Sequence, residues 1–231
     1  MLALSDAISS DPRRDRDQSA ILPSTTQVVN PRIFDWLSMA AGVGDAHWQL
    51  IAQAAVPPGA TVLDIGVATG NLLLKVKRAV PDATVVGLDS DAASLAFAAT
   101  KASRLAAEVQ LDRGDAADLA YSDATFDRVL SAFLLHHLPL DQQLRMLREV
   151  RRVLKPGGSL HLLDFTPGGK GMVFRPLSVE VSRRHQLDTS FERHPQSGHT
   201  LALMQTELFD GTQVGQGRSR LGHHVFYRAT R

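Results

Sequence analysis

Short apolar runs alternate with longer amphipathic segments through the middle of the chain. The runs are rich in valine, isoleucine and leucine, as expected for strands that helices cover on both faces. This alternation is typical of βαβ units, so it predicts a largely parallel sheet. The predicted strands are residues 61–65, 84–88, 109–112, 128–131 and 159–164, and the predicted helices between them are residues 70–80, 92–106 and 141–154.

The last of these helices shows how apolar spacing supports the assignment. Leucine and valine recur at three- and four-residue steps from Leu144 to Leu154, which places them on one helix face. Asp141 is expected to cap the start of the helix, because its carboxylate can accept hydrogen bonds from unpaired backbone amides. Residues 155–158, Lys-Pro-Gly-Gly, are expected to end the helix and turn the chain into the next strand.

The two ends of the chain carry weaker patterns. Residues 1–20 combine charge with little apolar surface, which predicts disorder and leaves a single domain over residues 21–231. An irregular segment is expected from the end of the fifth strand to about residue 199. The remaining predicted elements are helices over residues 31–41, 45–54 and 201–209 and strands over residues 212–218 and 223–229.

Charge balance and the absence of cysteine narrow the classes of function. The 231 residues contain 25 Lys and Arg and 24 Asp and Glu, so a net charge of +1 gives no global attraction for nucleic acid. The lack of cysteine excludes a disulfide framework, thiolate metal sites and a cysteine nucleophile. No run approaches the roughly 20 apolar residues of a membrane span. We therefore expect a cytoplasmic protein without a nucleic-acid or membrane partner, and a homodimer stays open.

The strongest chemical signal is residues 62–71, Val-Leu-Asp-Ile-Gly-Val-Ala-Thr-Gly-Asn, where a predicted strand runs into a turn. Glycine lacks a side chain and tolerates positive φ, so Gly66 and Gly70 let a ligand approach the backbone. Asp64, at the end of the strand, is placed to accept hydrogen bonds from a cationic amine or from backbone amides. The G-x-G-x-x-G spacing is absent, which disfavours a nicotinamide dehydrogenase.

A second carboxylate, Asp89, follows the second predicted strand. An acid at this point of a nucleotide-binding sheet accepts hydrogen bonds from a ribose diol. An acid after a strand also serves as a helix cap, and Ser90 and Asp91 compete for that role. Combined with the glycine turn, the position of Asp89 favours the ribose ligand.

The turn and three later segments together resemble class I S-adenosylmethionine-dependent methyltransferases, in particular the small-molecule branch of ubiquinone and menaquinone biosynthesis. The later segments are residues 112–119, 126–138 and 147–158, the last of which ends in Leu-Lys-Pro-Gly-Gly. Ala68 departs from the pattern, because glycine is usual there. The resemblance implies S-adenosyl-L-methionine as methyl donor and S-adenosyl-L-homocysteine as product. It also implies a Rossmann-like, doubly wound α/β fold with a mostly parallel seven-stranded sheet, helices on both faces and an antiparallel C-terminal strand.

The resemblance further implies roles for individual residues. Asp115 would accept a hydrogen bond from the exocyclic amine of adenine. Phe34 lies in an N-terminal helical lid, about residues 30–55, where an aromatic ring near a sulfonium gains cation–π attraction; the competing interpretation is that these aromatic residues belong to the core. The implied cofactor-binding residues are Asp64, Gly66, Ala68, Gly70, Asp89, Ser90, Asp115, Ala116, Ser131 and Phe34.

His136 and His137 follow the fourth predicted strand and are the candidates for a general base, because imidazole titrates near neutrality. Adjacent residues point in different directions, so at most one of them is expected to reach the methyl group. The competing interpretation is that one packs in the loop and bonds the backbone. Orientation alone can supply about 7 to 11 kcal/mol of the barrier, so the reaction does not demand a base, and no metal site is expected.

The sequence therefore predicts methyl transfer to an oxygen, nitrogen or carbon of a small molecule by in-line displacement. The irregular segment, about residues 165–199, and the N-terminal helices are expected to form the acceptor pocket. Two alternatives stay open: a catalytically silent module that retains the cofactor fold, and an RNA-directed methyltransferase, which would need a basic face.

Overall fold

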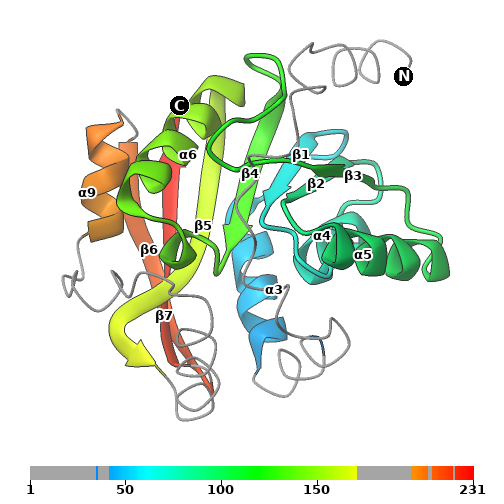
Figure 1. The fold of residues 1–231 in the computed structure, drawn as a ribbon, viewed down its shortest axis with the longest axis horizontal. Helices are drawn as coiled ribbons and strands as arrows, with labels where there is room; N and C mark the ends of the chain where they lie inside the picture. Colours follow the sequence, from blue (N-terminus) through cyan, green and yellow to red (C-terminus); the bar gives the residue numbers. More distant parts are fainter. Residues whose placement is uncertain (1–34, 36–41, 171–198, 208–209, 221) are drawn as a thin grey trace.

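The structure, a computed structural model, describes residues 35, 42–170, 199–207, 210–220 and 222–231. Seven strands form one sheet in the order β3-β2-β1-β4-β5-β7-β6 (Figure 1). Every predicted strand is present. The bounds are β1 Thr61–Ile65, β2 Thr84–Asp89, β3 Gln110–Arg113, β4 Phe126–Ala132, β5 Leu154–Lys170, β6 Asp210–Ser219 and β7 Gly222–Thr230.

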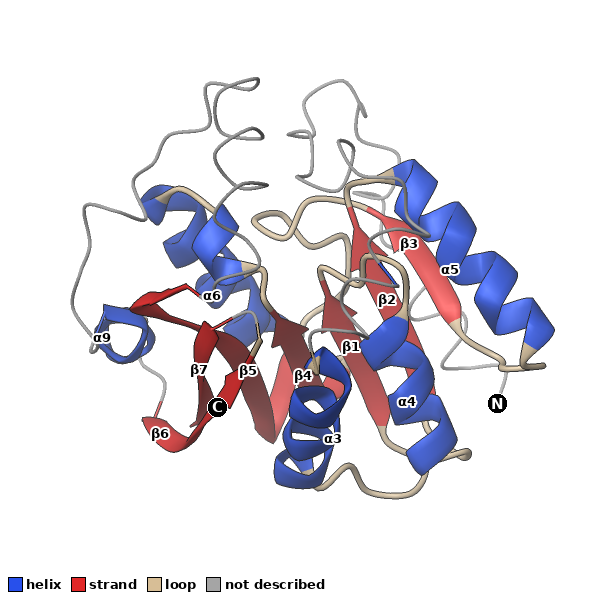
Figure 2. Ribbon diagram, turned by 90° about the horizontal axis from the view of Figure 1, so that it is seen from below, coloured by secondary structure: helices blue, strands red, loops and turns tan. Residues whose placement is uncertain are grey.

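Helices cover both faces of the sheet. The described helical segments are α3 Val43–Ala54, α4 Asn71–Ala79, α5 Ala92–Arg104, the 3-10 turn η4 Leu135–His137, α6 Leu140–Val153 and α9 His199–Thr206. Val62 packs in the cluster that α3, α4 and α5 cover, whereas its neighbour Leu63 packs in the cluster that α6 and α9 cover. Figure 2 shows α3 and α4 on one face and α6 on the other. This two-sided burial explains why the central strands β1 and β2 are largely apolar.

The direction in which strands are added reverses between β1 and β4. From β1 the chain proceeds outward through β2 and β3, then returns to β4 on the other side of β1 and continues to β5. The strands from β3 to β5 pair in parallel, and β7 pairs antiparallel with both β5 and β6. The doubly wound fold with one antiparallel C-terminal strand is therefore confirmed. Ligands of such sheets bind outside the carboxyl ends of the strands, at this reversal point.

The start of α6 differs from the prediction. The helix begins at Leu140 after Pro139, one residue earlier than expected, so Asp141 lies in the first turn and does not cap it. Its carboxylate instead accepts from Arg145 at 2.8 Å, one turn further along. An acid in the first turn still complements the positive end of the helix dipole.

Strand β5 is longer than predicted at both ends. It begins at Leu154, which pairs with Phe126, and the register of this pairing then shifts. The expected turn over residues 155–158 is therefore an irregularity within the strand. At the other end the strand continues to Lys170, which pairs with Gly222 of β7, where the sequence predicted an irregular segment. Pairing with a distant strand extends β5, and local sequence does not encode that pairing.

Some predictions lie outside the described residues. They concern the tail over residues 1–20, Phe34, the helix over residues 31–41 except Asp35, and most of the segment over residues 165–199. None of the helices described above is long and apolar enough to cross a membrane. Within the described ranges, no group of three or more His, Asp or Glu side chains is arranged to hold a metal ion.

Candidate functional site

The turn after β1 is a tight backbone loop at the reversal point of the sheet. Gly66, Ala68 and Gly70 all have positive φ, at 76°, 45° and 80°. A Cβ atom added to Gly66 would lie 3.0 Å from Leu134, in the segment that follows β4. Glycine is thus required at position 66 by both conformation and space, whereas Ala68 carries a left-handed conformation that disfavours an L residue by about 1 kcal/mol.

Asp64 is a buried carboxyl group at the carboxyl end of β1, only 2% exposed. It accepts a hydrogen bond from the backbone amide of Leu73, and its Oδ2 has no hydrogen-bond partner among the described residues. Burial, and then the nearby Asp89 carboxylate, raise the pKa of Asp64 from 3.8 to about 8. A bound cation would supply the missing partner and favour the ionised carboxylate. The side chain therefore fits a primary ammonium group, such as that of an amino acid.

Asp89 ends β2 and braces the glycine turn. Its Oδ2 accepts from the amide of Ala68 at 2.7 Å, and its Oδ1 accepts from the amide of Asp91 at 2.9 Å. Burial raises the pKa of Asp89. The helix cap is Asp91, whose carboxylate accepts from the amides of Ala93 and Ser94 at the start of α5. Of the residues considered for the cap, Asp91 takes it and Ser90 does not, and a ribose diol could still donate to the carboxylate of Asp89 through its further lone pairs.

Asp35 connects the N-terminal part of the chain to the glycine turn. Its carboxylate accepts hydrogen bonds from Thr69 and from Asn71 on either side of Gly70, the latter at 2.8 Å. Lys101 of α5 forms an ion pair with it at 2.7 Å and donates to the Asn71 amide oxygen at 2.6 Å. Asp35 therefore lies next to the residues predicted to hold the cofactor.

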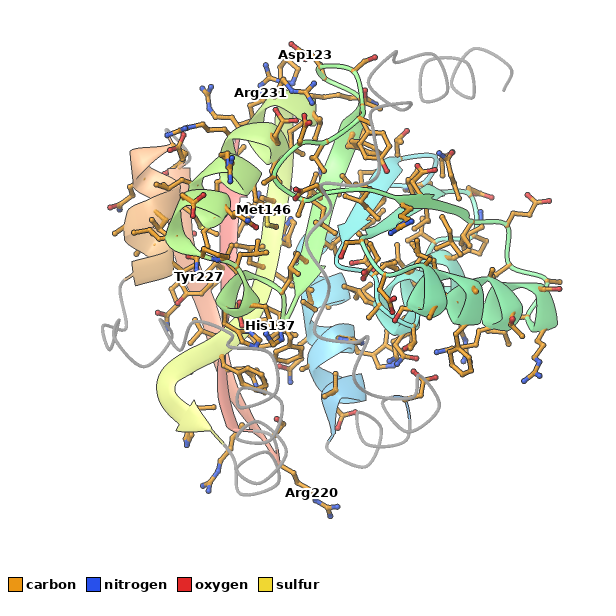
Figure 3. All side chains as sticks on the ribbon, viewed as in Figure 1. Asp123, His137, Met146, Arg220, Tyr227 and Arg231 are labelled. Atoms are coloured by element: carbon orange, nitrogen blue, oxygen red, sulfur yellow. The ribbon has the colours of Figure 1, made fainter. Side chains whose placement is uncertain are left out.

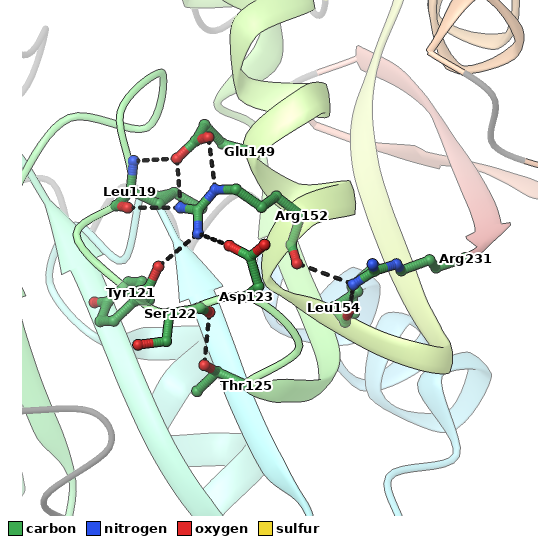
Figure 4. Close-up of polar contacts among 9 residues, drawn as sticks. All are labelled: Leu119, Tyr121, Ser122, Asp123, Thr125, Glu149, Arg152, Leu154 and Arg231. Atoms are coloured by element: carbon green, nitrogen blue, oxygen red, sulfur yellow. Dashed lines mark hydrogen bonds and ion pairs between the residues drawn. The ribbon is translucent and has the colours of Figure 1, made fainter. Parts of the chain in front are cut away.

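The loop between β3 and β4 carries Asp115 and is fixed to α6 by one arginine (Figure 4). Asp115 accepts from the amide of Ala117 at 2.8 Å within the loop. Arg152 donates to the carbonyl oxygens of Leu119 and Tyr121 and pairs with Glu149, whose carboxylate also accepts from the Leu119 amide. These bonds hold the loop that contains the predicted adenine segment.

The end of β4 lies against the end of β1. Ser131 donates from Oγ to the carbonyl oxygen of Ile65 at 2.9 Å, directly before the glycine turn. Phe133 follows with a φ of 58°, although it is not glycine, and donates its amide to Leu163 of β5 at 2.7 Å. Strained backbone of this kind is concentrated at functional sites, because surrounding contacts must hold it in place.

His136 in η4 meets Asp164 at the end of β5. The imidazole Nδ1 lies 2.5 Å from Asp164 Oδ1, and the His136 backbone amide donates to Asp164 Oδ2 at 3.0 Å. The ring of His137 packs against that of His136 at an interplanar angle of 42°, with centroids 3.9 Å apart, and His137 itself is exposed. Figure 3 labels His137 at the carboxyl end of β4. The two adjacent histidines thus have different environments, as expected for neighbours in a turn.

Aromatic rings gather beside this pair. The ring of Phe133 lies 4.7 Å from that of Phe165, 6.3 Å from that of His224 and 6.4 Å from that of His47. Both His47 and His224 are buried, and the Nδ1 atom of each has no hydrogen-bond partner among the described residues. Burial, with Lys75 and Lys101 nearby, lowers the pKa of His47 to about 3, so the ring is neutral.

The structure brings most of the sequence-predicted site residues together at one edge of the sheet. The elements that carry them are the ends of β1, β2 and β4 and the loop after β3. Sequence reasoning did not assign Asp164, although it lies at the carboxyl end of a predicted strand, as Asp64 and Asp89 do. That position was the available signal. It also missed Asp35, Phe133, His47 and His224, for which long-range packing is the only signal.

Comparison with known proteins supplies independent findings. A family model described as a methyltransferase domain matches residues 62–158. A demethylmenaquinone methyltransferase of Thermus thermophilus is 39% identical over 64% of this chain and 68% of its own length. One of Deinococcus radiodurans is 34% identical over 64% of the chain and 62% of its own length. A 2-phytyl-1,4-naphthoquinone methyltransferase of Synechococcus elongatus is 35% identical over 51% of the chain and 52% of its own length. The chain thus spans about half to two-thirds of these relatives.

Solved structures agree with the fold. An S-adenosylmethionine-dependent methyltransferase from Aquifex aeolicus superposes with a TM-score of 0.60 at 19% identity, covering 93% of this chain and 98% of that one. Phosphoethanolamine N-methyltransferase 2 of Haemonchus contortus, solved with S-adenosyl-L-methionine, gives a TM-score of 0.69 at 17% identity, covering 96% of this chain and 59% of that one. At these identities the likeness concerns the fold alone.

Proposed function

We propose, because this chain belongs to the class I S-adenosylmethionine-dependent methyltransferases, that it transfers a methyl group from S-adenosyl-L-methionine to a small-molecule acceptor. The observation that carries the proposal is Asp64, a buried carboxyl group next to the glycine turn, one oxygen of which has no hydrogen-bond partner in the described part of the chain. An uncompensated carboxylate in such a place is costly, unless a ligand supplies the opposite charge. The α-amino group of the methyl donor has that charge.

Different residues around the turn bind different groups of S-adenosyl-L-methionine, the methyl donor. Asp64 pairs with its ammonium group, and the backbone from Gly66 to Gly70 lies against its chain, where side chains would obstruct it. Asp89 accepts from its ribose hydroxyls, and Asp115 accepts from its adenine amine. When bound, S-adenosyl-L-methionine supplies an electrophilic methyl group attached to a sulfonium. Ala68, Ser90, Ala116 and Ser131 complete the proposed cofactor-binding set.

The acceptor in this proposal is a planar aromatic molecule of the quinone class, bound in its reduced form. The names of the relatives support that class, since they specify demethylmenaquinone and 2-phytyl-1,4-naphthoquinone. The rings of Phe133 and Phe165, 4.7 Å apart, support it independently. Aromatic side chains offer a flat ligand both buried area and favourable ring contacts. The neutral ring of His47 adds a polar atom without a charge.

Methyl transfer is tested directly with tritiated methyl donor. The full chain is incubated with methyl-labelled S-adenosyl-L-methionine and, in separate reactions, with reduced 1,4-naphthoquinone, phenol, phosphoethanolamine and bulk tRNA. The proposal expects label in the naphthohydroquinone and an equal amount of S-adenosyl-L-homocysteine. The variant Asp64→Ala is expected to lose this turnover, because it removes the partner of the donor's ammonium group.

Two other outcomes would replace the proposal. Binding of S-adenosyl-L-homocysteine without turnover of any acceptor would indicate a catalytically silent module. Label in tRNA alone would indicate an RNA-directed methyltransferase.

A further inference from the structure

His136 and Asp164 lie in contact at the carboxyl ends of two neighbouring parallel strands, β4 and β5. His136 lies in η4, directly after β4, and Asp164 lies near the carboxyl end of the paired segment of β5. Their side chains are only 15% and 6% exposed and approach to 2.5 Å between Nδ1 and Oδ1. Neither distance nor burial is typical of a surface ion pair, which is exposed and worth little.

The hydrogen bonds around Asp164 determine the direction of the contact. The backbone amide of His136 donates to Oδ2 at 3.0 Å, and that of Phe165 donates to Oδ1 at 2.7 Å. A carboxylate that already receives two amide donors acts as an acceptor, so Nδ1 of His136 donates its proton to it. In a neutral imidazole only one nitrogen carries a proton, and Nε2 therefore keeps its lone pair.

Ring contacts fix the plane of this imidazole. The ring of His137 lies 3.9 Å away on one side, and the ring of Phe165 meets it edge-on at 5.3 Å. The titratable groups in contact with His136 include His137 from its own turn and Asp164 from β5. A general base keeps its orientation during the reaction when ring packing holds it and its other nitrogen is hydrogen-bonded to a carboxylate.

The pair lies beside the glycine turn. Leu134, two residues before His136, is the side chain that a Cβ at Gly66 would meet at 3.0 Å. Phe133, one residue earlier, has the strained backbone and borders the aromatic cluster. The imidazole therefore belongs to the same edge of the sheet as the proposed methyl donor and acceptor.

We infer that Asp164 is a positioning residue that holds His136 as the general base of the transfer. The inference rests on the proposed function. The acceptor's hydroxyl proton passes to Nε2, and the electron pair of the O–H bond stays on the acceptor. The electron-rich acceptor then forms the new bond to the methyl carbon. The carbon–sulfur bond breaks with its electron pair on sulfur, which becomes a neutral thioether. The imidazolium that results is paired with the Asp164 carboxylate.

The inference restricts the chemistry of the acceptor. A base is useful only where the acceptor loses a proton, as a phenol or hydroquinone does. When the methyl group goes to a ring carbon, the hydrogen of that carbon then moves to the oxygen that lost its proton. Methylation at oxygen and methylation at carbon therefore both release one proton. An acceptor whose nucleophile is an already unprotonated amine would gain nothing from His136.

The experiment reads the tautomer of His136 as well as activity. Nitrogen-15 NMR of the full labelled chain at alkaline pH is expected to show His136 protonated at Nδ1 and unprotonated at Nε2. The His136 signals are assigned by their loss in His136→Gln. Asp164→Asn should shift the ring toward the Nε2-protonated tautomer and lower kcat for reduced 1,4-naphthoquinone by roughly 10²- to 10⁴-fold. Affinity for S-adenosyl-L-homocysteine should stay within about twofold. His136→Gln should lower kcat by a similar factor. Because this variant leaves Asp164 unchanged, it still tests the inference if Asp164→Asn fails to fold.

Asp127→Asn is the matched control. Asp127 accepts from the Thr61 amide and from Lys155, both at 2.8 Å, at the opposite end of β4. This variant should leave the His136 signals and kcat unchanged. An Nε2-protonated ring in the wild type, or a kcat that neither Asp164→Asn nor His136→Gln lowers, overturns the inference. A wild-type chain that does not bind S-adenosyl-L-homocysteine at all overturns the proposed function instead.

Discussion

Asp64 and Asp89 illustrate what single residues contribute to this site. Both lie at the carboxyl ends of parallel strands next to the reversal point, and the sequence pattern was sufficient to place them at this edge of the sheet. The pattern did not reveal how deeply both are buried, nor that the turn amide of Ala68 would bind Asp89. Their burial disfavours the ionised form of both carboxyl groups, and each group should therefore respond to pH and to a bound cation in a predictable direction.

Asp64 should make the stability of the ligand-free protein fall as pH rises. Its pKa is raised in the folded protein from 3.8 to about 8, so between these values the folded state retains a proton that the unfolded state has lost. The free energy of unfolding therefore declines with rising pH across this window, by up to about 1.4 kcal/mol per pH unit, and levels off above it. Urea unfolding of wild type and Asp64→Asn between pH 4 and pH 9 measures this. Identical pH dependence in both proteins would contradict the assignment.

Asp89→Ala should weaken S-adenosyl-L-homocysteine binding by about 1 to 3 kcal/mol through lost charged hydrogen bonds. Asp91→Ala is the control from the same loop. It removes the cap of α5 and so lowers the free energy of unfolding by about 1 kcal/mol, while leaving affinity nearly unchanged. Isothermal titration calorimetry compares the two. Equal affinity losses in both variants would indicate that loop position, and not a ribose contact, explains the effect.

At the scale of elements, the periodicity of apolar residues predicted the type of each segment and, for most segments, its approximate bounds. The expected helices over residues 70–80 and 92–106 are found as α4 and α5, within two residues at each end. Strand β5 is the exception, because its extra length comes from pairing with β7, far away in sequence. Proline and glycine at residues 156–158 indicated a turn, and the same residues instead form an irregularity inside the strand.

The loop between β3 and β4 depends on Arg152 of α6. Arg152→Ala removes bonds to Leu119, Tyr121 and Glu149 and should lower the free energy of unfolding by about 2 to 3 kcal/mol, as expected for charged hydrogen bonds that are partly buried. Arg148→Ala, on the exposed side of the same helix, removes an ion pair with Glu207 and should lower the free energy of unfolding far less, because solvent screens this exposed pair. Denaturant unfolding measures the free energy of unfolding of both variants. Equal losses in Arg152→Ala and Arg148→Ala would contradict the role of the Arg152 network.

At the scale of the whole molecule, the sequence predicted the fold class, but not all the parts that meet at the site. Asp35 comes from the N-terminal region, His224 comes from the last strand, and both reach the edge where β1 and β4 end. Such meetings depend on topology and on packing between distant segments. Short-range patterns contain no information on them, which is why the sequence assigned residues mainly to the proposed cofactor site and few to the proposed acceptor site.

The intact chain should distinguish its ligand classes by thermal stability. S-adenosyl-L-homocysteine at 100 times its Kd should stabilise the folded state by about 2.7 kcal/mol, because it binds the folded state alone. The same concentration of NADH should leave Tm unchanged, since the glycine spacing required for a dinucleotide is absent. Scanning fluorimetry measures both shifts. A shift with NADH and none with S-adenosyl-L-homocysteine would restore the dehydrogenase interpretation.

A crystal structure of the chain with S-adenosyl-L-homocysteine tests the central claim most directly. The account predicts that the amino group of the ligand lies within hydrogen-bond distance of Asp64 Oδ2, its ribose hydroxyls within that distance of Asp89, and its sulfur on the side of the β4 segment that carries His136. Density for the ligand elsewhere, with Asp64 Oδ2 still unpartnered, would contradict it.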